Sequence, residues 1–235
     1  MAISAAIIGA LGAAARVGDP FYNSVSLLLH MDGANNGSVF TDNSPNPKTP
    51  TLLSSPVTVT DDYKFAPSSF LGDGTSATTG RCLNYASHAD FNILTGDFTL
   101  EFFFKSYNNS QDAGIVSLGD VAAVFGISAT SGKILFRPGG TSVLALTGAV
   151  DSAWHHVAFS RQSGTLRGFV DGVLKGTVAN STSYGQSNLV VGAWSSQSAT
   201  RYGCNGRLDE VRLTKGISRY NAAFTAPTSP FPNSI

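Results

Sequence analysis

From Phe21 onward the apolar residues of this chain fall into short runs and alternations, each bounded by Gly, Asn, Asp or Ser. This pattern of short apolar runs between turn-forming residues is typical of β-strands joined by turns. Charged residues make up only 13% of the 235 residues, and two glutamates, Glu101 and Glu210, are too few for long charged helices. Many short strands with few helices predict an all-β fold, in which two antiparallel sheets pack as a sandwich.

Turn residues predict the local order of several strands. Asp171-Gly172 separates two apolar runs, and positive φ at both of its positions suits a type I′ hairpin turn. We expect a longer turn over residues 161–165 to join the strand beginning at Trp154 to the next strand. Residues 41–67 are interpreted as a long irregular connection, and residues 221–235 as a tail along the surface.

The first residues differ from the rest. Residues 2–15 carry no charge and are rich in Ala, and their apolar stripe at helical spacing predicts a short helix. At about 21 Å this helix is shorter than the roughly 30 Å core of a bilayer, so we predict no membrane span. Since the stripe would bury poorly alone, residues 1–20 are predicted to attach the chain to other proteins or to identical chains. The attachment stripe consists of Ile3, Ile7, Ile8 and Leu11.

Two further features narrow the range of functions. Fifteen Lys and Arg residues balance fifteen Asp and Glu residues without any basic run, so we predict no nucleic acid partner. Cys82 and Cys204 have no zinc-binding spacing. They are either two buried thiols or one bridge between sheet neighbours.

Five motifs, in order, resemble those of laminin-G-like, concanavalin A-like jelly rolls. They are Leu28-Leu29-His30-Met31-Asp32-Gly33, Gly96-Asp97-Phe98-Thr99-Leu100-Glu101-Phe102, Trp154-His155-His156-Val157-Ala158-Phe159, Leu166-Arg167-Gly168-Phe169-Val170-Asp171-Gly172 and Gly206-Arg207-Leu208-Asp209-Glu210-Val211-Arg212. The resemblance implies one jelly-roll domain over residues 21–235. Residues 214–227 are similar to the T-K-G-x-x-R-Y-x-x-x-F-x-x-P ending of bacteriophage and environmental copies of this domain, which implies a virion protein.

Catalytic motifs are missing from the sequence. Retaining glucanases that share the jelly roll carry E-x-D-x-x-E on one strand, whereas Glu101 and Glu210 lie on separate predicted strands. The sequence also has no G-x-S-x-G, no H-E-x-x-H and no P-loop. We therefore predict a binding protein and not an enzyme.

The resemblance also implies one structural calcium ion. In similar jelly rolls the opening and closing strands are neighbours, and such an ion often lies near acidic residues there. Asp32, the carbonyl of Gly33 and Asp209 are the expected oxygen ligands. In the competing interpretation, Asp32-Gly33 forms a turn and Asp209 accepts hydrogen bonds from backbone amides.

Aromatic side chains in a loop-rich stretch suggest a glycan site. Trp194, Tyr202 and Tyr184 are expected to stack on sugar rings, while Asn180 binds hydroxyl groups. Alternatively, these aromatic rings cap the sandwich or contact another chain.

The sequence thus favours a non-enzymatic component of the virion surface, either a capsid decoration or a tail protein. It would dock on other virion proteins or identical chains through its first residues, and bind a host-surface glycan or a protein through the jelly roll. One alternative is a secreted carbohydrate-binding module that begins with a signal peptide. Another is a divergent glycoside hydrolase that uses Glu101 or Glu210.

Overall fold

The computed structural model describes residues 18–74, 80–107, 112–119, 125–185, 187–197 and 202–235. Sheet A contains β1 (Val25–Leu29), β3 (Thr58–Val59), β4 (Ser69–Leu71), β6 (Phe98–Ser106), β11 (Trp154–Gln162), β12 (Thr165–Val170), β13 (Val173–Ala179) and β15 (Gly206–Lys215). Sheet B contains β2 (Thr51–Leu53), β5 (Cys82–Tyr85), β7 (Ala113–Leu118), β8 (Phe125–Thr130), β9 (Lys133–Pro138), β10 (Leu144–Thr147) and β14 (Leu189–Val191). Two short 3-10 turns, η1 (Tyr22–Ser24) and η2 (Ala89–Phe91), complete the described elements.

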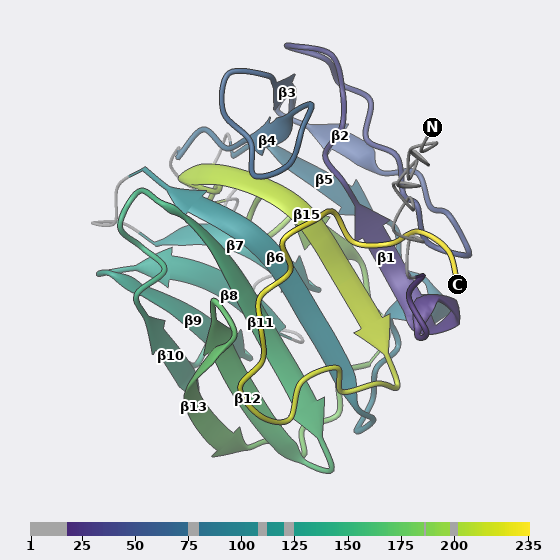
Figure 1. The fold of residues 1–235 in the computed structure, drawn as a ribbon, viewed down its shortest axis with the longest axis vertical. Coiled ribbons are helices and arrows are strands. Elements are labelled where there is room, and N and C mark those ends of the chain that lie inside the picture. The colour runs from purple at the N-terminus through teal and green to yellow at the C-terminus, as the bar shows by residue number, and fades with distance from the viewer. Residues whose placement is uncertain (1–17, 75–79, 108–111, 120–124, 186, 198–201) are drawn as a thin grey trace, which may run out of the picture.

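The two sheets are antiparallel and lie face to face (Figure 1). Sheet A has the order β13-β12-β11-β6-β15-β4-β3, and β1 also pairs with β15. Sheet B has the order β10-β9-β8-β7-β14-β5-β2. The predicted all-β sandwich is therefore confirmed, whereas the predicted N-terminal helix lies outside the described residues.

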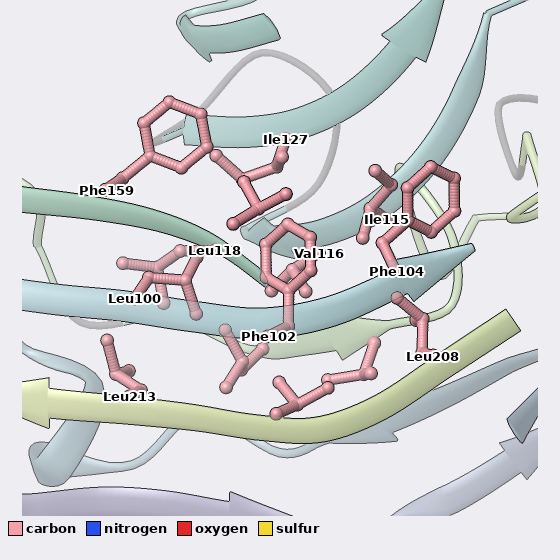
Figure 2. Packing of buried hydrophobic residues seen from close by; sticks show 14 of the residues in the cluster. Leu100, Phe102, Phe104, Ile115, Val116, Leu118, Ile127, Phe159, Leu208 and Leu213 are labelled. Atoms are coloured by element: carbon pink, nitrogen blue, oxygen red, sulfur yellow. The ribbon is translucent and has the colours of Figure 1, made fainter. Parts of the chain in front are cut away.

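Alternation along the strands builds the core between the sheets. On β6, Leu100, Phe102 and Phe104 point toward sheet B, where they meet side chains such as Val116 and Ile127 (Figure 2). All five are fully or almost fully buried. Burial of each such side chain contributes about 1.5–3 kcal/mol, so this layer is the main source of stability.

Tight turns fix the register of β11, β12 and β13 in sheet A. Asp171 and Gly172 have φ values of 50° and 76°, which confirms the predicted type I′ turn. Ser163 and Gly164 form the neighbouring turn with φ values of 48° and 74°. Pairing continues up to Gln162 and Thr165, so this turn is tighter than predicted.

The last twenty residues, the C-terminal tail (residues 216–235), run across the outer face of sheet A over β11 (Figure 1). Phe231 is only 3% exposed and packs on Phe103 of β6. Tyr220 and Phe224 stack with their ring centroids 3.6 Å apart. We call this covered surface the tail face, and the outer surface of sheet B the pocket face.

Both ends of the described chain meet on the tail face. The backbone N–H of Asp19 donates to the carbonyl of Ser234 at 2.8 Å. Among the described residues, no helical segment could cross a membrane.

Candidate ligand-binding site

Two of the four predicted glycan residues come together on the pocket face. Trp194 and Tyr202 line a pocket of about 190 Å³, and both the Trp194 and the Gly114 amides donate to the backbone carbonyl of Tyr202. The side chain of Tyr202 stays 41% exposed, while Trp194 is 7% exposed. Tyr202 therefore offers a ring to solvent, and Trp194 forms part of the floor.

A glycine of β8 makes room for the Trp194 ring. Phe125 and Ile127 face the core, so Gly126 between them faces outward. A Cβ at Gly126 would lie 2.8 Å from Cζ3 of Trp194, closer than the ring allows. The indole therefore lies directly on the sheet, because this position lacks a side chain.

An ion pair forms one wall of the pocket. Arg137 of β9 donates from Nη1 and Nη2 to the two carboxylate oxygens of Asp112, each at 3.1 Å. The guanidinium also lies 5.4 Å from the centre of the Trp194 ring, within cation–π range. The Asp112 side chain remains 48% exposed, so its oxygens can still accept hydrogen bonds from a ligand.

Two buried polar atoms at the pocket lack partners. Ser128 of β8 and Arg137 both line the pocket. Neither the Ser128 hydroxyl nor Nε of Arg137 forms a hydrogen bond within the described part of the chain. Since buried polar groups are normally paired, a molecule that displaced the atoms covering them would supply the missing hydrogen bonds.

The other two predicted glycan residues do not belong to this pocket. Tyr184 is fully buried, and its hydroxyl donates to Oδ1 of Asn180 at 2.9 Å. The buried Arg161 guanidinium stacks on the Tyr184 ring at 4.7 Å and donates to Asn180. This correction follows from the charge of Arg161, which draws nearby polar groups inward to pair with it.

The predicted calcium ligands lie near a β-bulge on the tail face. Glu210 has a φ of 51°, and the register of β15 shifts between Asp209 and Arg212. Oδ2 of Asp209 accepts from the amides of Lys64 and Phe65, each at 2.9 Å. This bonding is the competing arrangement considered for Asp209.

The charge balance of this cluster nevertheless suits a cation. Burial, helped by the Glu210 and Asp32 carboxylates, raises the pKa of Asp209 to about 8 although the two amides oppose the shift. Oδ1 of Asp209 is buried without a partner among the described residues. Burial and Glu210 also raise the pKa of Asp32, against the effect of His30.

The predicted calcium site has too few side-chain ligands among the described residues. Within the described ranges, no three His, Cys, Asp or Glu side chains come close enough to share a metal ion. The Gly33 amide donates to Ser68, which leaves its carbonyl as the predicted ligand. A pocket of about 480 Å³ opens beside Asp32 and His30, with tail residues 229–234 as its other wall. The calcium ion stays a prediction, with Asp209 Oδ1 as its best-supported ligand.

Both glutamates are engaged in buried structural contacts on the tail face. Glu101 is fully buried, accepts from Arg212 at 2.8 and 3.0 Å, and also accepts from the Tyr220 hydroxyl at 2.8 Å. Burial alone raises the pKa of Glu101, but Arg212 and the other donors outweigh it and hold this pKa well below its usual range. Glu210 bonds to His30 and to the amide of Phe231. Neither carboxylate is placed to attack or protonate a substrate.

Two other predictions concern the two cysteines and the N-terminal attachment stripe. Cys82 and Cys204 are buried thiols that are not bridged. The attachment residues Ile3, Ile7, Ile8 and Leu11 lie outside the described residues.

Three polar residues of the pocket were not predicted from the sequence. Asp112, Ser128 and Arg137 come from three neighbouring strands or their ends, so only the folded sheet brings them together. Period two gives a partial signal, because Phe136 faces the core and Arg137 must then face outward.

The chain is thus a two-sheet antiparallel sandwich that covers one face with its own tail and carries an aromatic, polar pocket on the other. The chain belongs to the concanavalin A-like lectin/glucanases superfamily, because the Laminin_G_3 family model matches residues 80–218, more than half of the chain. A comparison with curated proteins gave no match.

Solved structures of toxin binding domains share the fold. The binding domain of Paraclostridial Mosquitocidal Protein 1 is 12% identical with a TM-score of 0.62, over 83% of this chain and 49% of that one. The binding domain of botulinum neurotoxin serotype D/C is 14% identical with a TM-score of 0.62, over 84% and 50%. That of botulinum neurotoxin serotype G is 13% identical with a TM-score of 0.62, over 83% and 48%. This chain thus spans about half the length of each binding domain, and none of the three is a virion protein.

Proposed function

We propose that this chain is a non-catalytic recognition domain that binds a glycan in the pocket of the pocket face. One observation carries the proposal: an exposed Tyr202 ring stands beside buried polar atoms of Ser128 and Arg137 that have no partner among the described residues. Aromatic rings supply an apolar contact surface, and unpaired polar atoms supply the orientation that a specific site requires.

The larger pocket on the tail face is a weaker candidate for a glycan. Its lining includes a single aromatic residue, Phe231, which is only 3% exposed. Tail residues form much of its wall, so its shape depends on the tail. In the pocket of the pocket face, Gly114, Ser128 and Arg137 lie on β7, β8 and β9, and rigid strands hold side chains in more precise positions than loops do.

The buried glutamates support recognition over hydrolysis. A retaining glycosidase places two carboxylates about 5–5.5 Å apart with access to the sugar. Here Glu101 lies under the tail and is held by Arg212, and Glu210 is held by His30 and Phe231. Use of either carboxylate in catalysis would require the tail to leave.

Relatives of the same fold bind both sugars and proteins. The binding domain of botulinum neurotoxin DC has been solved in complex with SialylT and in complex with rat synaptotagmin II. At 13–14% identity these structures support the fold alone. The choice of a glycan for this chain therefore depends on its own pocket.

A glycan array tests the proposal. The full chain should bind a subset of array glycans, and Tyr202→Ala should lose this binding. Tyr63→Ala is a matched control, because Tyr63 is 40% exposed and lies outside the pocket. If no glycan of any class binds the folded chain, glycan recognition is wrong, and a protein ligand takes its place as the candidate.

We further propose that the domain is carried on a virion surface through the segment before residue 18. The similarity of residues 214–227 to bacteriophage copies of the domain supports this role. Because Asp19 bonds to Ser234 on the tail face, the chain before residue 18 joins the domain on the side away from the pocket. An attached partner would leave the pocket open.

Deletion of residues 2–16 tests the attachment. The truncated chain should fold with an unchanged thermal midpoint and fail to join particles. Normal incorporation would contradict attachment through this segment. A mature protein that starts near Val17 would instead favour the secreted carbohydrate-binding module.

A further inference from the structure

We infer that the pocket takes the terminal residue of a neutral glycan, bound through adjacent hydroxyl groups, and that it rejects acidic sugars. This inference rests on the proposed function and specifies the ligand of the same site. It follows from the charge, the unpaired polar atoms, the size and the aromatic surface of the pocket.

The charge of the pocket is internally balanced. Both terminal nitrogens of Arg137 donate to Asp112 at 3.1 Å, so the positive charge of the guanidinium is already matched by a carboxylate of the protein. The half-exposed carboxylate of Asp112 would repel a second carboxylate. A hydroxyl group carries no charge and can donate to Asp112, so neutral sugars meet no such repulsion.

The polar atoms of the pocket are complementary to a group that can both donate and accept hydrogen bonds. Nε of Arg137 can only donate, Asp112 can only accept, and the Ser128 hydroxyl can do either. Each lines the same pocket, and Nε and the Ser128 oxygen are unpaired within the described residues. Two adjacent hydroxyls of one sugar ring can donate to the carboxylate while accepting from Nε or from Ser128.

The size of the pocket limits the ligand to one ring. Sites for drug-sized molecules enclose about 300–1,000 Å³, whereas this pocket encloses about 190 Å³. A ring within a longer glycan would need space on both sides for its neighbours. The end of a glycan needs space on only one side, which favours a terminal residue.

The two aromatic residues then have different roles. Trp194 is 7% exposed and lies between Gly126 and the Arg137 guanidinium, so it shapes the floor. Tyr202 is 41% exposed and can cover the apolar C–H face of the sugar. The backbone carbonyl of Tyr202 accepts from the Gly114 and Trp194 amides, and a change of the side chain leaves these hydrogen bonds in place.

Titration of the full chain with free monosaccharides tests the inference. The neutral probes are galactose, glucose and mannose, and the acidic probes are glucuronate and N-acetylneuraminate. Wild type should bind at least one neutral probe and neither acidic probe. Tyr202→Ala and Ser128→Ala should each weaken binding by about tenfold, the scale of a buried contact at the centre of a site. Tyr63→Ala should leave binding unchanged.

Asp112→Asn gives the sharpest result. The change keeps the shape of the side chain but leaves the Arg137 charge unmatched. We expect neutral sugars to bind about tenfold more weakly, and glucuronate to gain binding that wild type lacks. Thermal melting of each variant confirms that it is folded, and Ser128→Ala still tests the pocket if the Tyr202 variant unfolds.

The outcomes separate this inference from the proposed function. Preference of wild type for acidic probes would overturn the neutral class while glycan binding stands. Neutral binding that survives both Tyr202→Ala and Ser128→Ala would place the sugar elsewhere on the chain. Absence of binding to every monosaccharide and every array glycan would overturn both proposals.

Discussion

Replacement of Glu101 by glutamine tests whether the tail is an integral part of the fold. Glu101 is fully buried and holds Arg212, while Arg212 and Arg219 both hold the Asp19 carboxylate. The Tyr220 hydroxyl of the tail donates to the other Glu101 oxygen. Glutamine keeps the shape of Glu101 but removes its charge, so Arg212 would face an amide in place of a carboxylate.

The geometry sets the expected size of the effect. Removal of one partner from a buried ion pair costs about 3–5 kcal/mol, because the other charge stays buried without its counterpart. Asp19 still compensates part of the Arg212 charge at 3.1 Å, so we expect about 3 kcal/mol, at the low end of the range. With a typical unfolding free energy of about 5–15 kcal/mol, such a loss is easily measured.

Urea denaturation provides the assay, with ΔG from the midpoint and an unchanged m-value. Asp112→Asn is the control, because the Arg137–Asp112 pair is partly exposed and is expected to contribute about 0–1 kcal/mol. A cost below about 1 kcal/mol for Glu101→Gln would refute the reasoning, since it would match the control.

The same variant gives a pH test. Arg212 and the other donors hold the pKa of folded Glu101 below its unfolded value, so its contribution to stability is present above the unfolded value of about 4.3. This contribution is lost as pH falls toward the folded pKa. Wild type should therefore lose more stability than Glu101→Gln between neutral pH and strongly acidic pH. Parallel stability curves would contradict the assignment.

Three further predictions follow from single contacts. Gly126→Ala should displace the Trp194 ring, cost about 1–3 kcal/mol of unfolding free energy and weaken sugar binding; unchanged melting and binding would contradict this packing. A chelator should lower the thermal midpoint of wild type but not of Asp209→Ala, while a midpoint that is insensitive to chelator in wild type would count against calcium. Cys82 and Cys204 should resist a thiol reagent until the chain unfolds, since both are buried and burial raises the pKa of the Cys204 thiol; rapid labelling of the native chain would contradict their burial.

Local patterns were sufficient to predict most strands but not the shortest ones. The Asp171-Gly172 turn formed as expected because its backbone preference is local. β2 and β3 lie in the segment that was interpreted as irregular, residues 41–67, and are only three and two residues long. They form because β5 and β4 offer them pairing partners, such as Leu83 for Leu52. That information is not local to the sequence around them.

Positions of side chains were harder to predict than strands. Two of the predicted loop aromatics, Trp194 and Tyr202, line one pocket. The expectation that aromatic residues in loops are exposed was wrong for Tyr184. It took no account of the buried Arg161, which stacks on the Tyr184 ring. At Glu210 a bulge with φ of 51° interrupts the alternation, and no turn residue marks this position in the sequence.

The tail explains why several residues of the segment 214–227 occur where they do. Arg219 pairs with Asp19, Tyr220 bonds to Glu101, and the Phe224 amide donates to the carbonyl of Gly172. All three contacts thus fix the tail on the tail face, and the Arg219 pair joins the tail to the N-terminal end of the described chain. Because the pocket lies on the opposite sheet, a partner joined at either end would not block it. The arrangement therefore suits a domain that is held from one side and binds its ligand on the other.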